Sequence, residues 1–270
     1  MEGRLITLTT DFGHKDPFVG IMKGVIFGIN PKANIIDLSH GIPPQDILAG
    51  ALVLRYAAPV FPRGTIHMAV VDPGVGGKRR PLLIESEGSF FIGPDNGILS
   101  LALEGKKVGR IINLSNELYY LKPASATFHG RDIFAPVAAY LSLGLPPQDF
   151  GEAVSDFVRL TWPQPAKTKG VLVGEVMYVD GFGNLITNIQ DRDLSAFQPD
   201  NLTFSVAGVT VQGLVSHYSG SENRDYAAVI NSWGLLEISS FGGNAQLLCG
   251  AKVGDKVLVQ EGQEPKGPTR

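Results

Sequence analysis

The feature of this 270-residue chain that most constrains its fold is a change in hydrophobic pattern close to residue 162. Before that point, short β-branched apolar runs alternate with segments whose apolar residues recur every three or four positions. After it, only short β-rich runs follow, separated by Gly and Asn turns. Alternating strands and helices are typical of a layered α/β domain, whereas many short strands indicate a barrel or sandwich. We therefore expect two domains of different class.

The first domain, residues 1–162, is expected to be an α/β domain with a central, largely parallel sheet. Asp16 and Asp132 are expected to cap its first and last helices, with Pro17 at the first helical position, where a missing N–H costs nothing. A turn at Glu87-Gly88 would make a hairpin. The expected strands are 5–9, 34–38, 65–71, 81–85, 89–92 and 108–113, and the expected helices are 16–29, 46–56, 97–103 and 132–143.

The second domain, residues 171–262, is expected to be an all-β barrel. A linker containing Pro and Lys, at 163–170, would join it to the first domain, and the polar tail at 263–270 is expected to be disordered. The expected strands are 170–179, 202–206, 209–215, 227–231, 235–238, 246–249 and 256–259.

Charge and cysteine content argue against several classes of protein. The net charge is −3 and no stretch is strongly basic, so nucleic acid is not an expected partner. Cys249 is the single cysteine, which excludes a disulfide framework and indicates a reducing compartment. The N-terminus lacks a signal-peptide pattern, and the longest apolar stretch, 47–61, is interrupted by Arg55 and Pro59. We therefore expect no membrane association and a cytoplasmic location.

Polar loops follow the expected strand ends in the first domain. The loops at 9–16, 37–41 and 72–80 all contain aspartate, and loops at the carboxyl ends of strands usually line the ligand crevice of an α/β sheet. Loop 72–80 is the most specific indication of a ligand site. Its three glycines permit a backbone path close to a ligand, and Asp72 is followed by Arg79. The alternative is that these aspartates only cap helices and turns.

Further candidate groups lie around His129 and in the second domain. His129 is expected near a helix N-terminus, where the dipole disfavours imidazolium, so a neutral ring can orient a water or accept a proton. Loops 180–188 and 231–234 carry Asn amides and aromatic rings that suit a purine, although ordinary hairpin turns would look the same. The Asp-Phe-Gly at 11–13 lacks the other kinase motifs, and no GxGxxG supports a dinucleotide site.

Seven segments together resemble one family. They are TTDFGHKDPFVGIMKG, IIDLSHGI, VDPGVGGKRR, GPDNG, FHGRDIFAP, DGFGNLITN and INSWGLLEI. In this order they look like the S-adenosyl-L-methionine hydroxide adenosyltransferases, or S-adenosylmethionine hydrolases, which are related to the 5′-fluorinases and 5′-chlorinases. The resemblance covers nearly the whole chain. It implies an α/β domain followed by a β-barrel, no cofactor or metal, and a homotrimer that holds its small-molecule substrate between the first domain of one subunit and the second domain of its neighbour.

The resemblance also implies roles for individual residues. The family's catalytic Asp, Arg and His match Asp72, Arg79 and His129. The expected substrate-binding residues are Asp11 at the ribose, Asp16 and Asp180 near the methionine amino group, Phe182 beside the purine, Asn184 at the adenine, Ser232 at the methionine, Trp233 where halogenases carry arginine, and Glu237, whose role stays undefined.

Asp72 decides which nucleophile we expect. A carboxylate in a poorly solvated pocket repels a halide by on the order of several kcal/mol, but it accepts a hydrogen bond from water. Arg79 can keep Asp72 ionised or stabilise hydroxide, and His129 can share the second proton of the water. We therefore expect hydrolysis to adenosine and L-methionine by in-line attack of water or hydroxide at C5′. Which group takes the proton stays open at this level.

Three other functions stay open. Within the same family, the chain can instead be a halide-using adenosyltransferase. In another class, it can be a divalent-metal hydrolase, and a third possibility is a sensor that binds S-adenosylmethionine without catalysis. The candidate ligands for a metal are Asp11, His14, Asp16, Asp37, His40 and Asp72.

Overall fold

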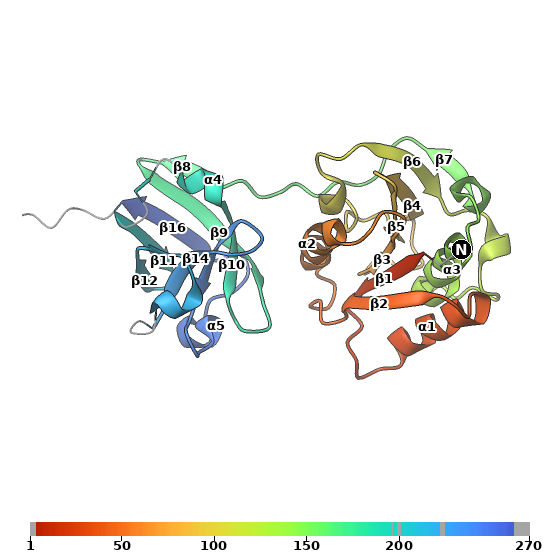
Figure 1. Cartoon of the computed structure of the whole chain (residues 1–270), viewed down its shortest axis with the longest axis horizontal. Coiled ribbons are helices and arrows are strands. Elements are labelled where there is room, and N and C mark those ends of the chain that lie inside the picture. The colour runs from red at the N-terminus through yellow and green to blue at the C-terminus, as the bar shows by residue number, and fades with distance from the viewer. Residues whose placement is uncertain (1–3, 196, 199–200, 222–224, 262–270) are drawn as a thin grey trace, which may run out of the picture. The chain divides into compact units, whose positions relative to one another are not determined.

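The computed structural model describes residues 4–195, 197–198, 201–221 and 225–261, so the tail at 263–270 lies outside the described residues. The chain divides into two compact units, the first ending at Thr161 and the second beginning at Trp162 (Figure 1). None of the helices described is both long enough and apolar enough to span a bilayer.

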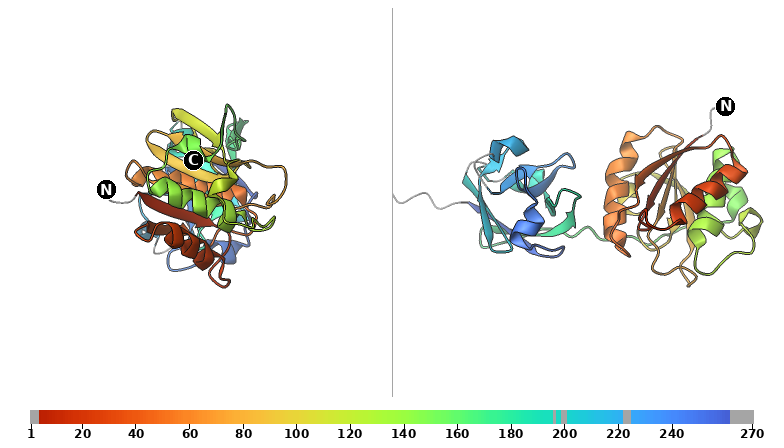
Figure 2. Two further views of the ribbon diagram at one scale, coloured as in Figure 1. Left: turned by 90° about the vertical axis from the view of Figure 1, so that its right-hand side faces the viewer. Right: turned by 90° about the horizontal axis from the view of Figure 1, so that it is seen from below.

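The first unit is built on one seven-stranded sheet with the order β2-β1-β3-β5-β4-β6-β7. Helices α1 and α3 pack together on one face of the sheet, and α2 covers the other face (Figures 1 and 2). The strands are β1 (Leu5–Thr10), β2 (Asn34–Ser39), β3 (Ile66–Val70), β4 (Pro81–Ser86), β5 (Ser89–Pro94), β6 (Val108–Asn113) and β7 (Glu152–Val154). The helices are α1 (Phe18–Ile29), α2 (Ile47–Ala57) and α3 (Ala135–Ser142), with short helical turns at Ala58–Val60, Leu101–Leu103, Glu117–Tyr119, Gly130–Phe134 and Pro147–Phe150.

The sheet is mixed, so the expectation of a largely parallel sheet holds only in part. Strands β2, β1, β3 and β5 run parallel, whereas β4, β6 and β7 pair antiparallel. The expected hairpin explains the change, because a two-residue turn can join only antiparallel strands. Glu87 and Gly88 both have positive φ, at 49° and 84°, as a type I′ turn requires.

The core of the first unit lies between the sheet and the α1–α3 pair. Ile6 and Leu8 of β1 are fully buried there with Met22 and Ile26 of α1, which lie four residues apart on one helix face. Nearly all of β1 is buried, and this explains its continuous run of apolar and threonine residues without alternation.

Three expected helix features in the first unit are wrong. Pro17 occupies the position before α1, and no described side chain caps that helix; Asp16 is exposed. Asp132 is fully buried inside a π-helical turn, where it binds Arg131 and the Ser125 N–H and so caps nothing. The helix expected at 97–103 shrinks to the single turn Leu101–Leu103, because β5 continues to Pro94 and the following residues 95–100 form bends and turns.

The second unit is a strongly curved nine-stranded sheet, nearly barrel-shaped, in which β12 approaches β14. Its path runs β12-β11-β16-β9-β10-β15-β14-β13, with β8 paired to β9. The strands are β8 (Ala166–Thr168), β9 (Val171–Val179), β10 (Leu185–Gln190), β11 (Leu202–Val206), β12 (Val209–Gln212), β13 (Leu214–Val215), β14 (Ala227–Ile230), β15 (Leu235–Ser239) and β16 (Lys256–Glu261). The helical segments are α4 (Asp191–Leu194), α5 (Ala245–Cys249) and a 3₁₀ turn at Tyr218–Ser221.

The second unit corrects three sequence expectations. The strand expected at 246–249 is the helix α5, because the Asn244 side chain accepts the Leu247 N–H and Gly250 ends the helix in the left-handed conformation. The second half of the polar loop expected at 180–188 belongs to strand β10, and 180–184 forms the turn. Part of the segment expected to be a linker forms β8.

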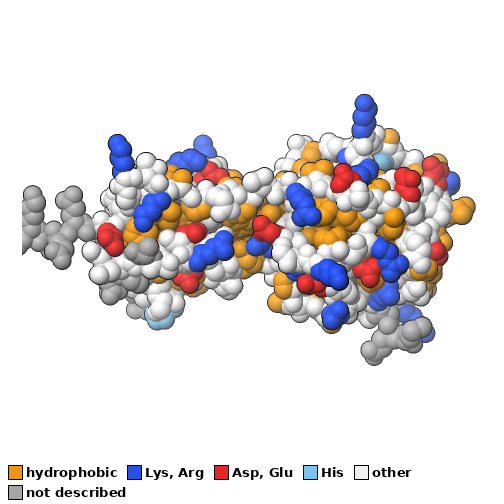
Figure 3. Space-filling view, turned by 90° about the horizontal axis from the view of Figure 1, so that it is seen from above, with side chains coloured by type: hydrophobic (Ala, Val, Ile, Leu, Met, Phe, Trp, Pro, Cys, Tyr) orange, Lys and Arg blue, Asp and Glu red, His pale blue; other side chains and the backbone are white. Residues whose placement is uncertain are grey.

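Charges on the surface are mixed in sign. On the face shown in Figure 3, Lys and Arg side chains are interspersed with Asp and Glu and do not form a large patch of one sign.

The buried position of Leu8 yields a stability prediction. Leu8 is 0% exposed in the core, whereas Leu118 is 85% exposed. We expect Leu8→Ala to lower the free energy of unfolding by about 2–5 kcal/mol, because it removes buried methyl groups and leaves a cavity. Chemical denaturation measures the change, with Leu118→Ala as the control expected to stay within about 0.5 kcal/mol. Equal losses in the two variants would contradict this packing.

Candidate functional site

The loop after β3 folds back tightly on the segment that precedes His129. Two turns shape it, in which the Val75 N–H donates to the Asp72 carbonyl at 3.2 Å and the Gly77 N–H donates to the Gly74 carbonyl at 3.0 Å. Gly76 has a φ of 75°, and a Cβ there would overlap the Ala126 carbonyl oxygen. Only glycine combines this backbone conformation with so close an approach.

This loop joins Asp72, Arg79 and His129, the three expected catalytic residues, into one cluster. Arg79 Nε lies 3.0 Å from both carboxylate oxygens of Asp72, and its Nη2 also donates to Oδ2. The same Nη2 lies 2.7 Å from His129 Nδ1. The Asp72 and Arg79 side chains are only 5% and 9% exposed, and the Phe134 ring packs beside the guanidinium. The Asp72–Arg79 pair is therefore charge-assisted and largely shielded from bulk water, whereas His129 is half-buried.

The contact with Arg79 determines the protonation of His129. A guanidinium can only donate hydrogen bonds, so Nδ1 must accept and the ring proton lies on Nε2. Burial lowers the pKa of His129, the positive charge of Arg79 lowers it further, and the carboxylates of Asp72 and Asp132 oppose both effects. The imidazole is therefore neutral at pH 7 and offers Nε2–H as a donor. It lines a pocket of about 430 Å³ together with Gly76 and Tyr120.

Asp11 and Asp16 lie in the loop after β1, whereas Asp37, expected in a loop, lies within β2. Asp11 Oδ2 accepts the Gln45 N–H at 2.8 Å, and Asp16 is exposed. Asp37 lies 2.6 Å from Lys23 Nζ and 3.0 Å from His40 Nε2. Burial opposes ionisation of Asp37, but these two partners outweigh it and lower its pKa.

Of the candidate metal ligands, Asp37 and His40 are 3.0 Å apart, but no third ligand in the described ranges joins them to form a metal site. Asp72 bonds to Arg79, Asp37 bonds to Lys23, and His14 is exposed with its ring against that of His40. Across the part of the chain that the structure describes, no three His, Cys, Asp or Glu side chains gather so that they could hold a metal ion.

In the second unit, Asp180 organises the turn between β9 and β10. Its Oδ1 accepts the backbone N–H groups of Phe182 and Asn184, both at 2.9 Å, and its Oδ2 accepts the Asn184 side-chain amide at 3.1 Å. Asn184 is buried, whereas the Phe182 ring is 78% exposed. Gly183 has a φ of 83° and packs against Asn244. The turn thus holds the Asn184 amide in place next to the exposed Phe182 ring.

The turn between β14 and β15 is held by Asn231. Its Oδ1 accepts the N–H groups of Trp233 and Leu235, at 2.9 and 3.1 Å, and its Nδ2 donates to Glu237 Oε2 at 3.0 Å. Ser232 is exposed, and the Trp233 ring lies 6.0 Å from that of Tyr178.

Glu237 is 2% exposed on β15. Burial raises its pKa, hydrogen bonds from Asn231 and Tyr218 oppose this, and the charge of Asp180 adds to the rise. Burial and the bond to Glu237 raise the pKa of Tyr218 to about 12. Sequence reasoning missed Tyr218, because it lies in a separate turn and no motif links it to Glu237.

The two turns lie at opposite ends of the paired strands β10 and β15. Leu185, next to the first turn, pairs with Ile238, and Gln190 pairs with Leu235, next to the second turn. Glu237 lies opposite Ile186 between them. The expected binding residues of this unit therefore form an elongated row.

The protonation of His129 gives a prediction that needs no substrate. Its pKa, followed by NMR titration of the imidazole, is expected below 6.5 in the native protein. Arg79→Gln removes the adjacent positive charge and leaves Asp72 unpaired, so the pKa should rise. Arg159→Gln, which changes an arginine outside the cluster, should leave it unchanged. A pKa that stays the same in Arg79→Gln would exclude the Arg79–His129 contact.

Comparisons with known proteins agree with this arrangement. Residues 6–151 match the SAM hydroxide adenosyltransferase N-terminal domain, and residues 174–258 match the C-terminal domain of the same family. A Methanocaldococcus jannaschii protein named (R)-S-adenosyl-L-methionine hydrolase is 37% identical, with 94% of this chain and 95% of that protein covered. A fluorinase from an Actinoplanes species is 30% identical, covering 70% of this chain and 73% of the fluorinase.

A solved structure shares the architecture. The crystal structure of an uncharacterized conserved protein from Thermotoga maritima has a TM-score of 0.88 and 34% identity, and the match covers 95% of this chain and all of that one. The two family domains match in chain order and together cover most of the sequence. The chain therefore belongs to the SAM hydroxide adenosyltransferase family.

Proposed function

We propose that this protein hydrolyses S-adenosyl-L-methionine to adenosine and L-methionine. The observation that carries the proposal is the Asp72–Arg79–His129 cluster, in which a carboxylate with a 5% exposed side chain pairs with a guanidinium that also contacts an imidazole. The name of the Methanocaldococcus jannaschii relative specifies the R configuration at sulfur, and we extend this preference to the present chain.

In the proposed reaction, water attacks C5′ in line with the C5′–S bond. The new O–C5′ bond forms as the C5′–S bond breaks, and the bonding pair returns to sulfur, which turns the sulfonium into the neutral thioether of methionine. One proton leaves the attacking water. A site that excludes bulk water and holds the nucleophile in line supplies much of the rate enhancement.

The hydrogen bonds of the cluster favour one assignment of proton roles. His129 Nδ1 already accepts from Arg79, so the neutral ring has no free acceptor, and its Nε2–H can orient the water oxygen. Asp72 Oδ1 takes only the Arg79 Nε bond and keeps a lone pair for the water proton. We therefore assign proton acceptance to Asp72, charge stabilisation to Arg79 and water orientation to His129.

The remaining residues are proposed to bind the substrate. Asp11 would hold the ribose, while Asp16 and Asp180 would face the methionine amino group. Phe182 would lie beside the purine. The other assignments are Asn184 to adenine and Ser232, Trp233 and Glu237 to the methionine side of the site. The turns at 180–184 and 231–234 lie at opposite ends of β10 and β15, which suits a substrate with a nucleoside at one end and an amino acid at the other. Asp180 lies at the adenine end, bonded to Asn184, so its assignment to the methionine amino group rests on the family resemblance alone.

We further propose a cytoplasmic homotrimer in which each site is completed by two subunits. The strongly exposed Phe182 ring and the exposed Ser232 are consistent with surfaces that a substrate and a neighbouring subunit cover. We propose no cofactor or metal, because the sulfonium already makes methionine a good leaving group.

Hydrolysis in ¹⁸O-labelled water tests the proposed function directly. We expect one ¹⁸O atom in the 5′-hydroxyl of adenosine, measured by mass spectrometry, and faster turnover of the R than of the S epimer at sulfur. Parallel reactions with added chloride, fluoride or chelator should give the same product at the same rate. A 5′-haloadenosine would instead identify a halogenase, loss of activity with chelator a metal enzyme, and absence of any product a binding protein.

Asp72→Asn tests the assigned proton acceptor. The amide keeps the shape but cannot take a proton at neutral pH, so kcat should fall about 10²-fold or more, within the range of general-base losses. Affinity for adenosine, measured by calorimetry, should change only a few-fold. Asp156→Asn is the control, because Asp156 is 77% exposed. Native kcat in Asp72→Asn would refute the assignment.

A further inference from the structure

A second cavity opens in the first unit, at the amino ends of the parallel strands, whereas Asp72 lies at their carboxyl ends. His67 lies at the start of β3, whereas Asp72 follows the end of the same strand. The cavity has a volume of about 140 Å³. The side chains that define its chemistry are Phe61, Arg63, His67, Glu87, Phe91 and Lys106. Neither the proposed reaction nor its substrate uses any of them.

His67 is the most unusual residue of this cavity, because it is an imidazole that is only 1% exposed. Its ring stacks on Phe91 at a centroid distance of 5.1 Å and meets the edge of Phe61 at 5.8 Å. Nδ1 lies 2.9 Å from the Thr7 hydroxyl, so Nε2 is the nitrogen left for a ligand in the cavity. Burial, assisted by the charge of Lys106, lowers the pKa of His67 to about 4, so the ring is neutral at pH 7.

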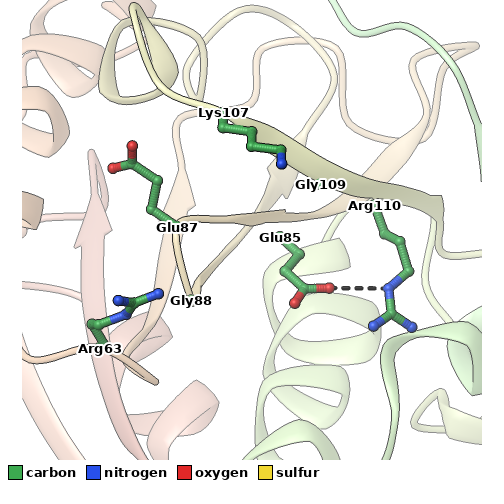
Figure 4. Close-up of a pocket in the computed structure, with 7 residues that line it drawn as sticks. All are labelled: Arg63, Glu85, Glu87, Gly88, Lys107, Gly109 and Arg110. Carbon is green, nitrogen blue, oxygen red and sulfur yellow. Dashed lines mark hydrogen bonds and ion pairs between the residues drawn. The ribbon is translucent and has the colours of Figure 1, made fainter.

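The charges around the cavity are mainly positive. The cavity shares Arg63 and Glu87 with an open groove that continues past Lys107 and Arg110 (Figure 4). Arg110 is neutralised by Glu85 at 3.1 Å, the ion pair that Figure 4 marks. Among the described residues, Arg63, Lys106 and Lys107 form no ion pair, and the opposing carboxylate is Glu87.

We propose that this cavity binds a small oxyanion, a phosphate group, at a site separate from the catalytic cluster. The cavity has room for about four water molecules, which fits one tetrahedral oxyanion, and a larger substituent would extend into the open groove. The planar guanidinium of Arg63 can donate two parallel hydrogen bonds to the phosphate. The ammonium of Lys106 adds a compact positive charge that attracts it. In the proposed tautomer, the Thr7 hydroxyl, 2.9 Å from His67 Nδ1, donates to that nitrogen, and Nε2–H is then a buried donor to the phosphate oxygen.

Calorimetric titration of the full-length protein with inorganic phosphate tests the proposal, at constant ionic strength maintained with chloride. We expect saturable binding that Arg63→Gln and Lys106→Gln each weaken about tenfold, because each removes a charged hydrogen bond. Glu87→Gln should strengthen binding several-fold, since it removes the opposing charge. Lys32→Gln, at an exposed lysine elsewhere in the first unit, is the matched control and should leave the affinity unchanged.

Two further measurements separate the possible outcomes. The ¹⁵N resonances of His67 should shift on addition of phosphate, and a parallel titration with methyl phosphate distinguishes a free phosphate from a phosphate ester as the preferred ligand. Adenosine formation in Lys106→Gln without phosphate should equal that of the native protein, so this test is independent of the proposed hydrolysis. Absence of saturable binding, or equal affinity in Lys106→Gln and Glu87→Gln, would overturn the proposal.

Discussion

The buried ion pair between Asp72 and Arg79 is the interaction on which the site in the first unit depends. Removing a carboxylate from water is costly unless a partner compensates for it, and Arg79 does so through both oxygens of Asp72. The same guanidinium binds His129 Nδ1, so one side chain pairs with the buried carboxylate and also selects the imidazole tautomer. The glycine turns of the loop make this geometry possible, because Gly76 lets the backbone pass close to Ala126.

The sheet explains why these groups meet at one edge. Strands β1 and β3 are parallel neighbours, so Asp11 and Asp72 both emerge at their carboxyl ends. The antiparallel part begins beyond β5 and leaves this edge intact. At the amino ends of β3 and β5, the same parallel arrangement leaves His67 and Phe91 facing the second cavity. The carboxyl ends of the parallel strands thus carry the Asp72 cluster, and their amino ends carry the second cavity.

Sequence predicted the parts of the site that depend on local pattern. Asp72 and Arg79 lie seven positions apart in one glycine-rich loop, and the structure pairs them as the sequence allowed. The neutral state of His129 was predicted for an incomplete reason, the helix dipole, whereas burial and Arg79, fifty positions away, lower its pKa. Asp132 has the sequence pattern of a helix cap, but it is fully buried and bonds instead to its neighbour Arg131 and to the Ser125 N–H, seven positions away. Long-range contacts such as that between Arg79 and His129 leave no periodic signal.

Electrostatics also bears on how the proposed reaction would end. The substrate enters with a cationic sulfonium, and the expected binding set contains several carboxylates, among them Asp11, Asp16 and Asp180. Cleavage of the C5′–S bond removes that positive charge, because adenosine is neutral and methionine carries no net charge. Attraction between the carboxylates and the ligand therefore weakens at the moment the products form. A site built this way binds the reactant better than its products, so the charge change itself favours product release.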